Sequence, residues 1–370
     1  MSRTLLFVGG SNRALPYFAT ANAKGIAAFS VDEATGAADL LGVTEGIDNP
    51  TFLASSADGK VLCATSEVLG WNEGTITAYA IDSATGGLTY LAKQPTRGDL
   101  AAHLSFDATG RYAASVNYTM LPMTARPNRS VVVYPLSAAG AIGPAMAEVA
   151  HQGKGQDPAR QDRPHAHCVR WTPDNRFVVV ADLGIDKLIV YAFDAGDGSL
   201  TPHGELALPR GSGPRHFAFH PTLPFAYSVN ELASTVASFA FDAAAGSFKL
   251  LGVDAAVPPA MLGHSHCSAI KIAPGGRHLF VGNRGEDTVA RFAIDPASGM
   301  ASRVGSVPAG GKTPRDFDFA PGGTCLAVAN QDSDTVDLFG YDGSTGALTP
   351  LGAPISTGTP TAIAWARFTG

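Results

Sequence analysis

The sequence predicts an all-β fold, specifically a seven-bladed β-propeller with four-stranded blades. Three observations predict it: a strand motif that recurs seven times, hairpin patterns before the later copies, and complementary strand patterns at the two ends of the chain. Helices are expected to be few, because no segment shows a long apolar period of 3.6 residues.

The recurring motif is a strand that ends in Asp, or in a residue that replaces Asp, and is often followed by a Thr/Ser-Gly turn. Successive copies end about 47 to 58 residues apart, close to the repeat length of kelch-type propellers. Each copy is expected to lie in its own blade. The seven copies are residues 25–32, 74–82, 130–136, 187–194, 234–242, 287–295 and 334–342.

Hairpins precede the later copies of this motif. Each has two short apolar strands around a Pro, Asp or Gly turn, at residues 169–180, 217–229, 270–281 and 317–328. The N-terminal segments 4–10, 25–32 and 38–43 supply only three strands, whereas segment 361–368 is a strand without a following partner. We expect the C-terminal strand to join the N-terminal strands, which closes the ring and removes exposed edges. Residues 1–370 are then one propeller domain.

The composition and net charge of the chain limit the classes of molecule that it can bind. The chain has 370 residues, a formal net charge of −6 and a pI of about 5.9, which argues against nucleic acid and anionic membranes. A small anionic ligand remains compatible, because a few arginines in one cleft reverse the charge locally. No signal peptide or membrane span is visible, so a cytoplasmic protein is expected, as a monomer or weak homo-oligomer. Four scattered cysteines, without a CxxC pair, are expected to be buried thiols rather than zinc ligands: Cys63, Cys168, Cys267 and Cys325.

Polar residues that interrupt the apolar pattern at strand ends are candidates for a site in the central channel. His165 and His167 precede an apolar strand and share one face of an extended chain, where imidazole suits acid–base chemistry. Arg215 and His216 follow two glycines, and arginine binds carboxylate or phosphate in a bidentate manner. Metal binding is not expected, because no further ligand lies near the histidine pair.

Two further clusters follow strands in neighbouring repeats. Asn230 and Glu231 end one strand, and Asn283 and Arg284 end the equivalent strand one repeat later. Asn117 occupies a related position, and turn capping alone explains the repeated Asn. Turn capping does not require Glu231 or Arg284, which makes these two the stronger candidates. Pocket residues of second rank, at matching positions in other repeats, are His103, Arg315, His264 and His266.

Two segments are too long for simple turns between strands. Residues 118–129 are rich in Met, Pro and Arg, and residues 150–164 carry several charged side chains. Long loops on a rigid scaffold often carry function, although a tolerated insertion explains them equally. If the ligand carries a phosphate, the cations expected to contribute from the second loop are Lys154, Arg160 and Arg163.

Several of these segments together resemble the lactonase family of seven-bladed β-propellers. The resemblance covers nearly the whole chain and is densest in residues 164–167, 181–187, 211–221, 229–232, 283–285 and 329–334. That family includes the propeller-type 6-phosphogluconolactonases and is similar to the fungal carboxy-muconate cyclases. The resemblance implies a site without cofactor that uses a histidine, two arginines and a glutamate. On this sequence these are His165 or His167, Arg215, Arg284 and Glu231.

Two departures from the family pattern lie near this site. Ala269 and Lys271 stand where the family usually has Asp and His, and the segment after Tyr118 is extended through Arg126 and Arg129. The chain lacks a Gly-x-Ser-x-Gly elbow and a P-loop, which disfavours serine hydrolases and nucleotide-phosphate binding.

The resemblance implies hydrolysis of a sugar lactone, 6-phosphoglucono-1,5-lactone in the pentose phosphate pathway, by activated water. Glu231 or one of the two histidines is expected to activate the water, with Arg215 and Arg284 binding the anion and the developing oxyanion. Expected substrate-binding residues are His103, Asn117, His216, Asn230, Asn283 and Arg315. The alternatives are a muconate-type cycloisomerase, a lactonase for a non-phosphorylated lactone, and a propeller that only binds other proteins.

Overall fold

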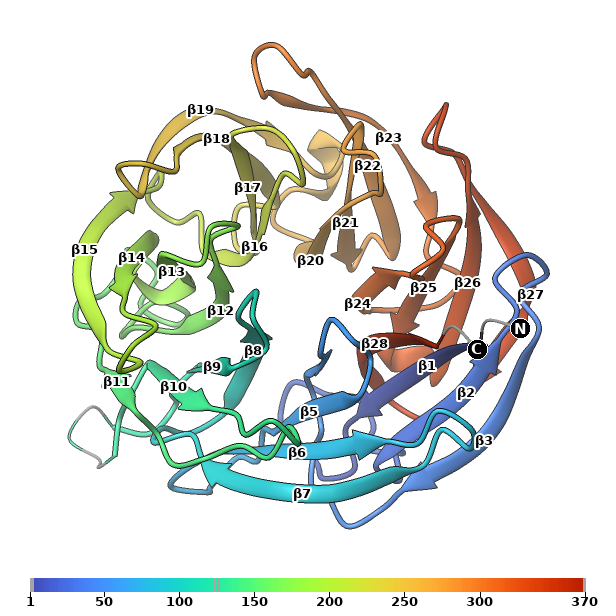
Figure 1. Ribbon diagram of the computed structural model, residues 1–370. Helices are drawn as coiled ribbons and strands as arrows, with labels where there is room; N and C mark the ends of the chain where they lie inside the picture. The colour runs from blue at the N-terminus through green and yellow to red at the C-terminus, as the bar shows by residue number, and fades with distance from the viewer. Residues whose placement is uncertain (1–2, 123, 125–126, 369–370) are drawn as a thin grey trace.

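The computed structural model describes residues 3–122, 124 and 127–368, which form seven four-stranded antiparallel sheets around a central axis (Figure 1). All seven sheets are thus twisted blades of one ring, and the predicted seven-bladed propeller is confirmed. From the axis outward, the first three blades are β28 (Pro360–Phe368), β1 (Arg3–Gly10), β2 (Ile26–Val31) and β3 (Ala38–Thr44); then β4 (Leu53–Ser55), β5 (Val61–Ser66), β6 (Thr75–Ile81) and β7 (Leu88–Pro95); then β8 (Ala101–Phe106), β9 (Tyr112–Asn117), β10 (Val131–Pro135) and β11 (Ala147–Val149). The last four blades, in the same direction, are β12 (Ala166–Trp171), β13 (Phe177–Asp182), β14 (Lys187–Phe193) and β15 (Leu200–Ala207); then β16 (Pro214–Phe219), β17 (Phe225–Asn230), β18 (Thr235–Asp242) and β19 (Ser247–Ala255); then β20 (His266–Ile272), β21 (His278–Arg284), β22 (Thr288–Ile294) and β23 (Ala301–Pro308); then β24 (Pro314–Phe319), β25 (Cys325–Asn330), β26 (Thr335–Tyr341) and β27 (Leu348–Ser356).

The repeated sequence motif corresponds to the third strand of every blade, namely β2, β6, β10, β14, β18, β22 and β26. The four predicted hairpins are the two inner strands of blades β12–β15, β16–β19, β20–β23 and β24–β27. Within the described ranges, helical structure is confined to three short 3₁₀ turns, Leu183–Ile185, Pro259–Met261 and Gln331–Ser333. Few helices were predicted, and this is confirmed.

The Asp that ends the third strand folds the turn to the outer strand. Asp32 Oδ1 accepts hydrogen bonds from the backbone N–H groups of Ala34 and Thr35, at 2.9 and 3.2 Å. Gly36 then adopts a φ of 73°, which a side chain would strain. Asp82 repeats the pattern in the next blade. The motif recurs because six blades use this Asp-capped turn, whereas in the blade of β8–β11 Ser137 Oγ accepts from the N–H of Ala141 at 3.1 Å instead.

The ring closes through its two ends. Strand β28 pairs with β1 in antiparallel register, from Phe368 opposite Arg3 to Pro360 opposite Gly10. This confirms the predicted closure, and Figure 1 shows both termini on the same blade. Since β28 contacts β4 and β24 on either side, it is the inner strand that links the first and last blades.

Carboxylates tie several blades to the loop that enters the next. Asp186 has a φ of 54° just before β14, and its two oxygens accept from the backbone N–H groups of Gly211 and Gly213 at 2.7 and 2.8 Å. Asp287 binds the N–H of Thr313 in the same way, at 2.8 Å. These contacts fix the loops that lead into the inner strands, and therefore the residues at the channel entrance.

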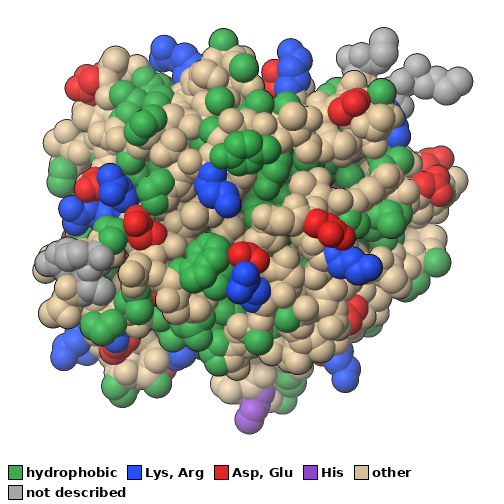
Figure 2. Space-filling view, turned by 90° about the horizontal axis from the view of Figure 1, so that it is seen from below, with side chains coloured by type: hydrophobic (Ala, Val, Ile, Leu, Met, Phe, Trp, Pro, Cys, Tyr) green, Lys and Arg blue, Asp and Glu red, His purple; other side chains and the backbone are tan. Residues whose placement is uncertain are grey.

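The apolar core lies between neighbouring blades rather than in one central mass. Phe217 on β16 and Phe239 on β18 are fully buried and pack with Phe248 on β19. All four cysteines are buried and free, as expected. On the side of the molecule in Figure 2, positive and negative side chains are interspersed and form no continuous basic surface. Among the described residues, no helix is long and apolar enough to cross a membrane.

Candidate active site

A cavity of about 600 Å³ lies where the inner strands begin and their neighbouring strands end. Its lining comes from all seven blades and from both long loops singled out in the sequence. Five arginines and three carboxylates line it, a formal charge of +2 in a chain whose net charge is −6. The charged residues are Arg160, Arg163, Arg215, Arg284, Arg315, Glu67, Asp162 and Glu231.

Register shifts at the start of the inner strands direct single side chains at the axis. In β16, Pro214 pairs with Asn230 and His216 with Val229, which leaves Arg215 without an opposite residue. The same shift isolates His167 in β12 and Arg315 in β24. A bulge of this kind redirects a side chain without ending the sheet. All three isolated residues line the cavity.

Glu231 is the centre of the charged cluster. Its Oε1 lies 2.6 Å from Arg160 Nη2, and its Oε2 lies 2.7 Å from Arg284 Nη2 and 3.0 Å from Arg215 Nε. Burial by itself raises the pKa of Glu231, but Arg284, Arg215 and Arg160 outweigh it and hold the pKa well below its ordinary value. The carboxylate is therefore ionised at neutral pH and a weak proton acceptor.

Arg215 is buried and held in one orientation. Its Nη1 donates to Ser268 O at 2.8 Å and to His216 Nε2 at 3.1 Å. Burial and the nearby Arg284 lower its pKa to about 9, against the opposing effect of Glu231, so the guanidinium stays charged at neutral pH. Among the described residues Nη2 has no hydrogen-bond acceptor. Its two N–H groups are therefore available to a ligand in the cavity.

The two predicted histidines differ in their anchoring. His165 Nδ1 lies 2.6 Å from Tyr118 O, and because a carbonyl only accepts, Nδ1 carries the proton. Burial lowers the pKa of His165, and burial together with Arg215 lowers that of His167 well below the ordinary value. Both imidazoles are neutral at pH 7, which suits proton acceptance.

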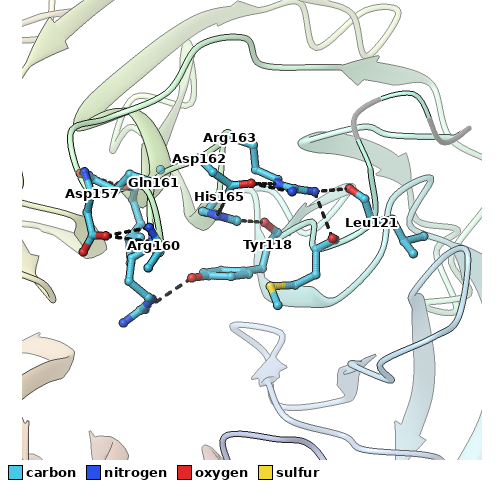
Figure 3. Close-up of polar contacts among 12 residues, drawn as sticks. Tyr118, Leu121, Asp157, Arg160, Gln161, Asp162, Arg163 and His165 are labelled. Carbon is cyan, nitrogen blue, oxygen red and sulfur yellow. Dashed lines mark hydrogen bonds and ion pairs between the residues drawn. The ribbon is translucent and has the colours of Figure 1, made fainter.

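The two long loops are joined to each other at the cavity (Figure 3). Arg163 Nη1 donates to the backbone oxygens of Met120 and Leu121, and its Nε and Nη2 bind Asp162. Arg160 Nη2 approaches the Tyr118 hydroxyl at 3.4 Å. Arg160 is therefore placed over the cavity, whereas Arg163 serves mainly to connect the loops. Arg126, which was expected to extend the first loop, lies outside the described residues.

Some predicted site residues lie away from the cavity. The amides of Asn117, Asn230 and Asn283 are fully buried and hold neighbouring strands: Asn117 Nδ2 donates to Thr96 O at 2.6 Å, and Asn283 Nδ2 to Ala256 O at 3.0 Å. Asn230 Nδ2 donates to Thr235 Oγ1 at 3.0 Å. None of the three lines the cavity, and their amides serve the blade repeat itself, so substrate binding by them stays a prediction.

Two histidines lie beneath the cavity instead of facing it. His103 is fully buried, with its ring 4.0 Å from that of Phe52, and it contacts no substrate-accessible space. His216 is also buried and accepts a hydrogen bond from Arg215. Both support the wall of the site. Of the second-rank residues, Arg315 and His266 line the cavity, whereas His264 and Lys154 are exposed outside it.

Residues that sequence reasoning missed as parts of the site come from the first three blades. Glu67 is buried, and its two oxygens accept from the hydroxyls of Tyr17 and Thr51, each at 2.6 Å. Tyr118 stacks on His165 with ring centroids 4.2 Å apart. The only signal for Glu67 was a carboxylate after an apolar strand, the same signal that singled out Glu231.

Lys271, one of the departures from the family pattern, points away from the cavity and pairs with Asp318 at 2.7 Å. Among the described residues, no group of three or more His, Cys, Asp or Glu side chains is placed to hold a metal ion. The candidate site therefore consists of two neutral imidazoles, an arginine cluster and an ionised glutamate.

Comparison with known proteins identifies the family of the chain. The lactonase family of seven-bladed β-propellers matches residues 6–365. The 6-phosphogluconolactonase of Bacillus subtilis is 34% identical over 80% of this chain and 81% of its own, and that of Formosa agariphila is 32% identical over 79% and 81%. The periplasmic gluconolactonase of Pseudomonas aeruginosa superposes with a TM-score of 0.88, at 30% identity, over 99% of both chains. The chain therefore belongs to the lactonase family of seven-bladed β-propellers, whose chemistry is lactone hydrolysis.

Proposed function

We propose that this protein hydrolyses 6-phosphoglucono-1,5-lactone to 6-phosphogluconate. The observation that carries the proposal is the arginine-lined cavity, whose charge of +2 opposes that of the whole chain and suits a phosphorylated, anionic substrate. Two neutral imidazoles in the same cavity suit activation of water at neutral pH. Relatives named 6-phosphogluconolactonase support the same substrate.

In the proposed mechanism His167 removes a proton from a water molecule that attacks the lactone carbonyl carbon. His167 is preferred over His165 because its ring centroid lies 5.5 Å from that of His216, which is hydrogen-bonded to Arg215. The carbonyl oxygen gains negative charge and accepts hydrogen bonds from Arg215 Nη2. The ring C–O bond then breaks, and the protonated His167 returns its proton to the leaving ring oxygen. Overall, one water is added across the C–O bond.

Glu231 does not act as the base in this mechanism. Its pKa lies well below the ordinary value, and both carboxylate oxygens contact arginines. Its role is to hold three guanidinium groups together in a buried site, where they would otherwise repel one another.

The phosphate is assigned to the outer part of the cavity. Arg160 is the suitable partner, because its side chain remains 37% exposed while one Nη group contacts Glu231. Arg315 is a second candidate. Among the described residues its guanidinium has one hydrogen-bond acceptor, Gln331 Oε1, at a long 3.4 Å, and it lies 4.8 Å from the Phe18 ring centroid. A phosphate dianion would neutralise the excess positive charge.

The test is an initial-rate assay on freshly generated 6-phosphoglucono-1,5-lactone, with the background hydrolysis subtracted. Glucono-1,5-lactone is assayed in parallel, and Arg215→Ala and added chelator serve as controls. The proposal expects a higher kcat/KM for the phosphorylated lactone, lost in Arg215→Ala. A preference for glucono-1,5-lactone, the substrate suggested by the name of the Pseudomonas relative, would overturn the phosphate assignment. No turnover of either lactone would overturn hydrolysis of these sugars.

A further inference from the structure

A second, much smaller pocket lies directly beneath the substrate cavity. It holds about 10 Å³, close to the space that one water molecule needs. The two pockets share His167, Arg215, Arg315, Glu67 and Ala102, so only side chains separate them. Its floor adds buried residues that the proposed reaction does not use, notably Asp316 and His216.

Three buried polar atoms without a hydrogen-bond partner belong to residues that line this pocket. They are His167 Nδ1, Arg215 Nε and Asp316 Oδ1. Arg215 Nε lies 3.0 Å from Glu231 Oε2, but its N–H is not aimed at that oxygen. Buried polar atoms are nearly always satisfied by protein or ordered water, so three such atoms on residues that line one small pocket point to a shared partner.

Asp316 is held so that one oxygen remains for such a partner. Its Oδ2 accepts from the backbone N–H of Ile363 on β28 at 3.0 Å, which fixes the carboxyl group in the channel wall. The register shift between Pro314 and Asp316 sends Arg315 into the substrate cavity and leaves Asp316 below it. Burial raises the pKa of Asp316, an effect that Lys271 partly opposes.

We propose that the small pocket is an internal water site formed by His167, Arg215 and Asp316, and that Asp316 is a positioning residue which orients His167 through this water. The water accepts from His167 Nδ1–H and Arg215 Nε–H and donates to Asp316 Oδ1. Three partners are typical for a buried water. With its proton held on Nδ1, His167 keeps the lone pair of Nε2 for the reaction. The catalytic part of this inference rests on the proposed function.

The experiment has a structural and a kinetic readout. A high-resolution crystal structure of the full chain is expected to show a water within hydrogen-bond distance of the three atoms, and ¹⁵N NMR to show the His167 proton on Nδ1. In Asp316→Ala, kcat is expected to fall about 10- to 100-fold, as for other groups that orient a reacting residue, with KM nearly unchanged. Asp316→Asn keeps an acceptor oxygen and is expected to restore most of kcat.

Asp318→Asn is the matched control, because Asp318 lies two residues away on β24 but pairs with Lys271 outside the pocket. Its kcat and ¹⁵N spectrum are expected to match the wild type. A wild-type crystal structure without this water, or an unchanged His167 spectrum in Asp316→Ala, would overturn the inference. If Asp316→Ala does not fold, the presence of the water in the wild-type structure and the kcat of Asp316→Asn still test the inference. Wild-type protein that shows the water and the tautomer but hydrolyses no lactone would refute the proposed function alone.

Discussion

Glu231 Oε2 lies 2.7 Å from Arg284 Nη2; Glu231 directly follows β17 and Arg284 ends β21, the equivalent strand of the neighbouring blade. Arg284 also donates to Cys267 O at 2.9 Å, which ties its guanidinium to the inner strand of its own blade. One carboxylate therefore joins two blades and three arginines at the axis. Because the arginines sit close together only while Glu231 is charged, the geometry of the site depends on this residue.

Replacing Glu231 with Gln is expected to lower kcat/KM by at least about 10²-fold and to destabilise the protein by about 3 kcal/mol, because buried guanidinium groups lose their counter-charge. Kinetics and denaturant unfolding measure the two effects. Glu205→Gln, which removes an exposed ion pair with Lys187, is the control. Wild-type stability of Glu231→Gln would contradict the role of Glu231 in holding the cluster.

Arg215→Ala is expected to lower kcat by about 10²- to 10³-fold, the usual cost of losing one oxyanion donor. Arg215→Lys is expected to recover little, because an ammonium cannot contact Ser268, His216 and the substrate at once. Arg277→Ala, in an exposed turn of the same propeller, should retain full activity. A high kcat in Arg215→Ala would exclude the assigned role.

The pH dependence of kcat is expected to have its acid inflection below pH 6.5. The neutral imidazole is the active form, and burial lowers the pKa of both His165 and His167 below the ordinary 6.5. Activity is therefore full above that pKa and falls as the pH drops through it. Rate profiles between about pH 4.5 and 8 check this. His167→Asn should remove the acid inflection of kcat, whereas His165→Asn should only shift the pH at which it occurs. The reverse result would assign the base to His165.

Arg160→Ala is expected to raise KM for the phosphorylated lactone about 10- to 100-fold, the range for losing a hydrogen bond between charged groups. KM for glucono-1,5-lactone should change far less. Lys154→Ala is a matched control, since Lys154 lies in the same loop but is exposed outside the cavity. Equal effects on both lactones would show that Arg160 acts through Glu231 rather than on the phosphate.

Asp182→Ala is expected to lower the free energy of unfolding by about 3 kcal/mol, measured by denaturant titration. Asp182 is fully buried, lies 2.6 Å from His151 Nδ1, and accepts from the backbone N–H of His165 at 2.8 Å. The same change should reduce activity because His165 loses its anchor. Asp174→Ala removes turn hydrogen bonds from Thr172 Oγ1 and the N–H of Arg176 in the same blade; it should cost about 1 kcal/mol at most and leave activity unchanged.

Much of the site was predictable because its residues break a repeat. His165, His167, Arg215, Glu231, Arg284 and Arg315 all line the cavity, and each interrupts an apolar pattern that the blades otherwise repeat. Asn117, Asn230 and Asn283 were also expected to bind substrate, but they recur with the repeat and bond within it, to Thr96 O, Thr235 Oγ1 and Ala256 O. Departure from the repeat therefore distinguishes site residues from structural ones.

The sequence by itself determined the number of blades, the Asp-capped turns, the closure by the last strand and most of the charged groups at the axis. These follow from local patterns, since strands alternate and turns need particular residues. Only the tertiary structure decided which side chains face the substrate and which lie beneath it. In β16 the unpaired residue is Arg215, and in β24 it is Arg315. Each faces the cavity while the next residue, His216 or Asp316, lies beneath it, because a one-residue shift reverses a side chain's direction. Glu67 and Tyr17 join the site only because the ring closes and brings the first blades beside the later ones.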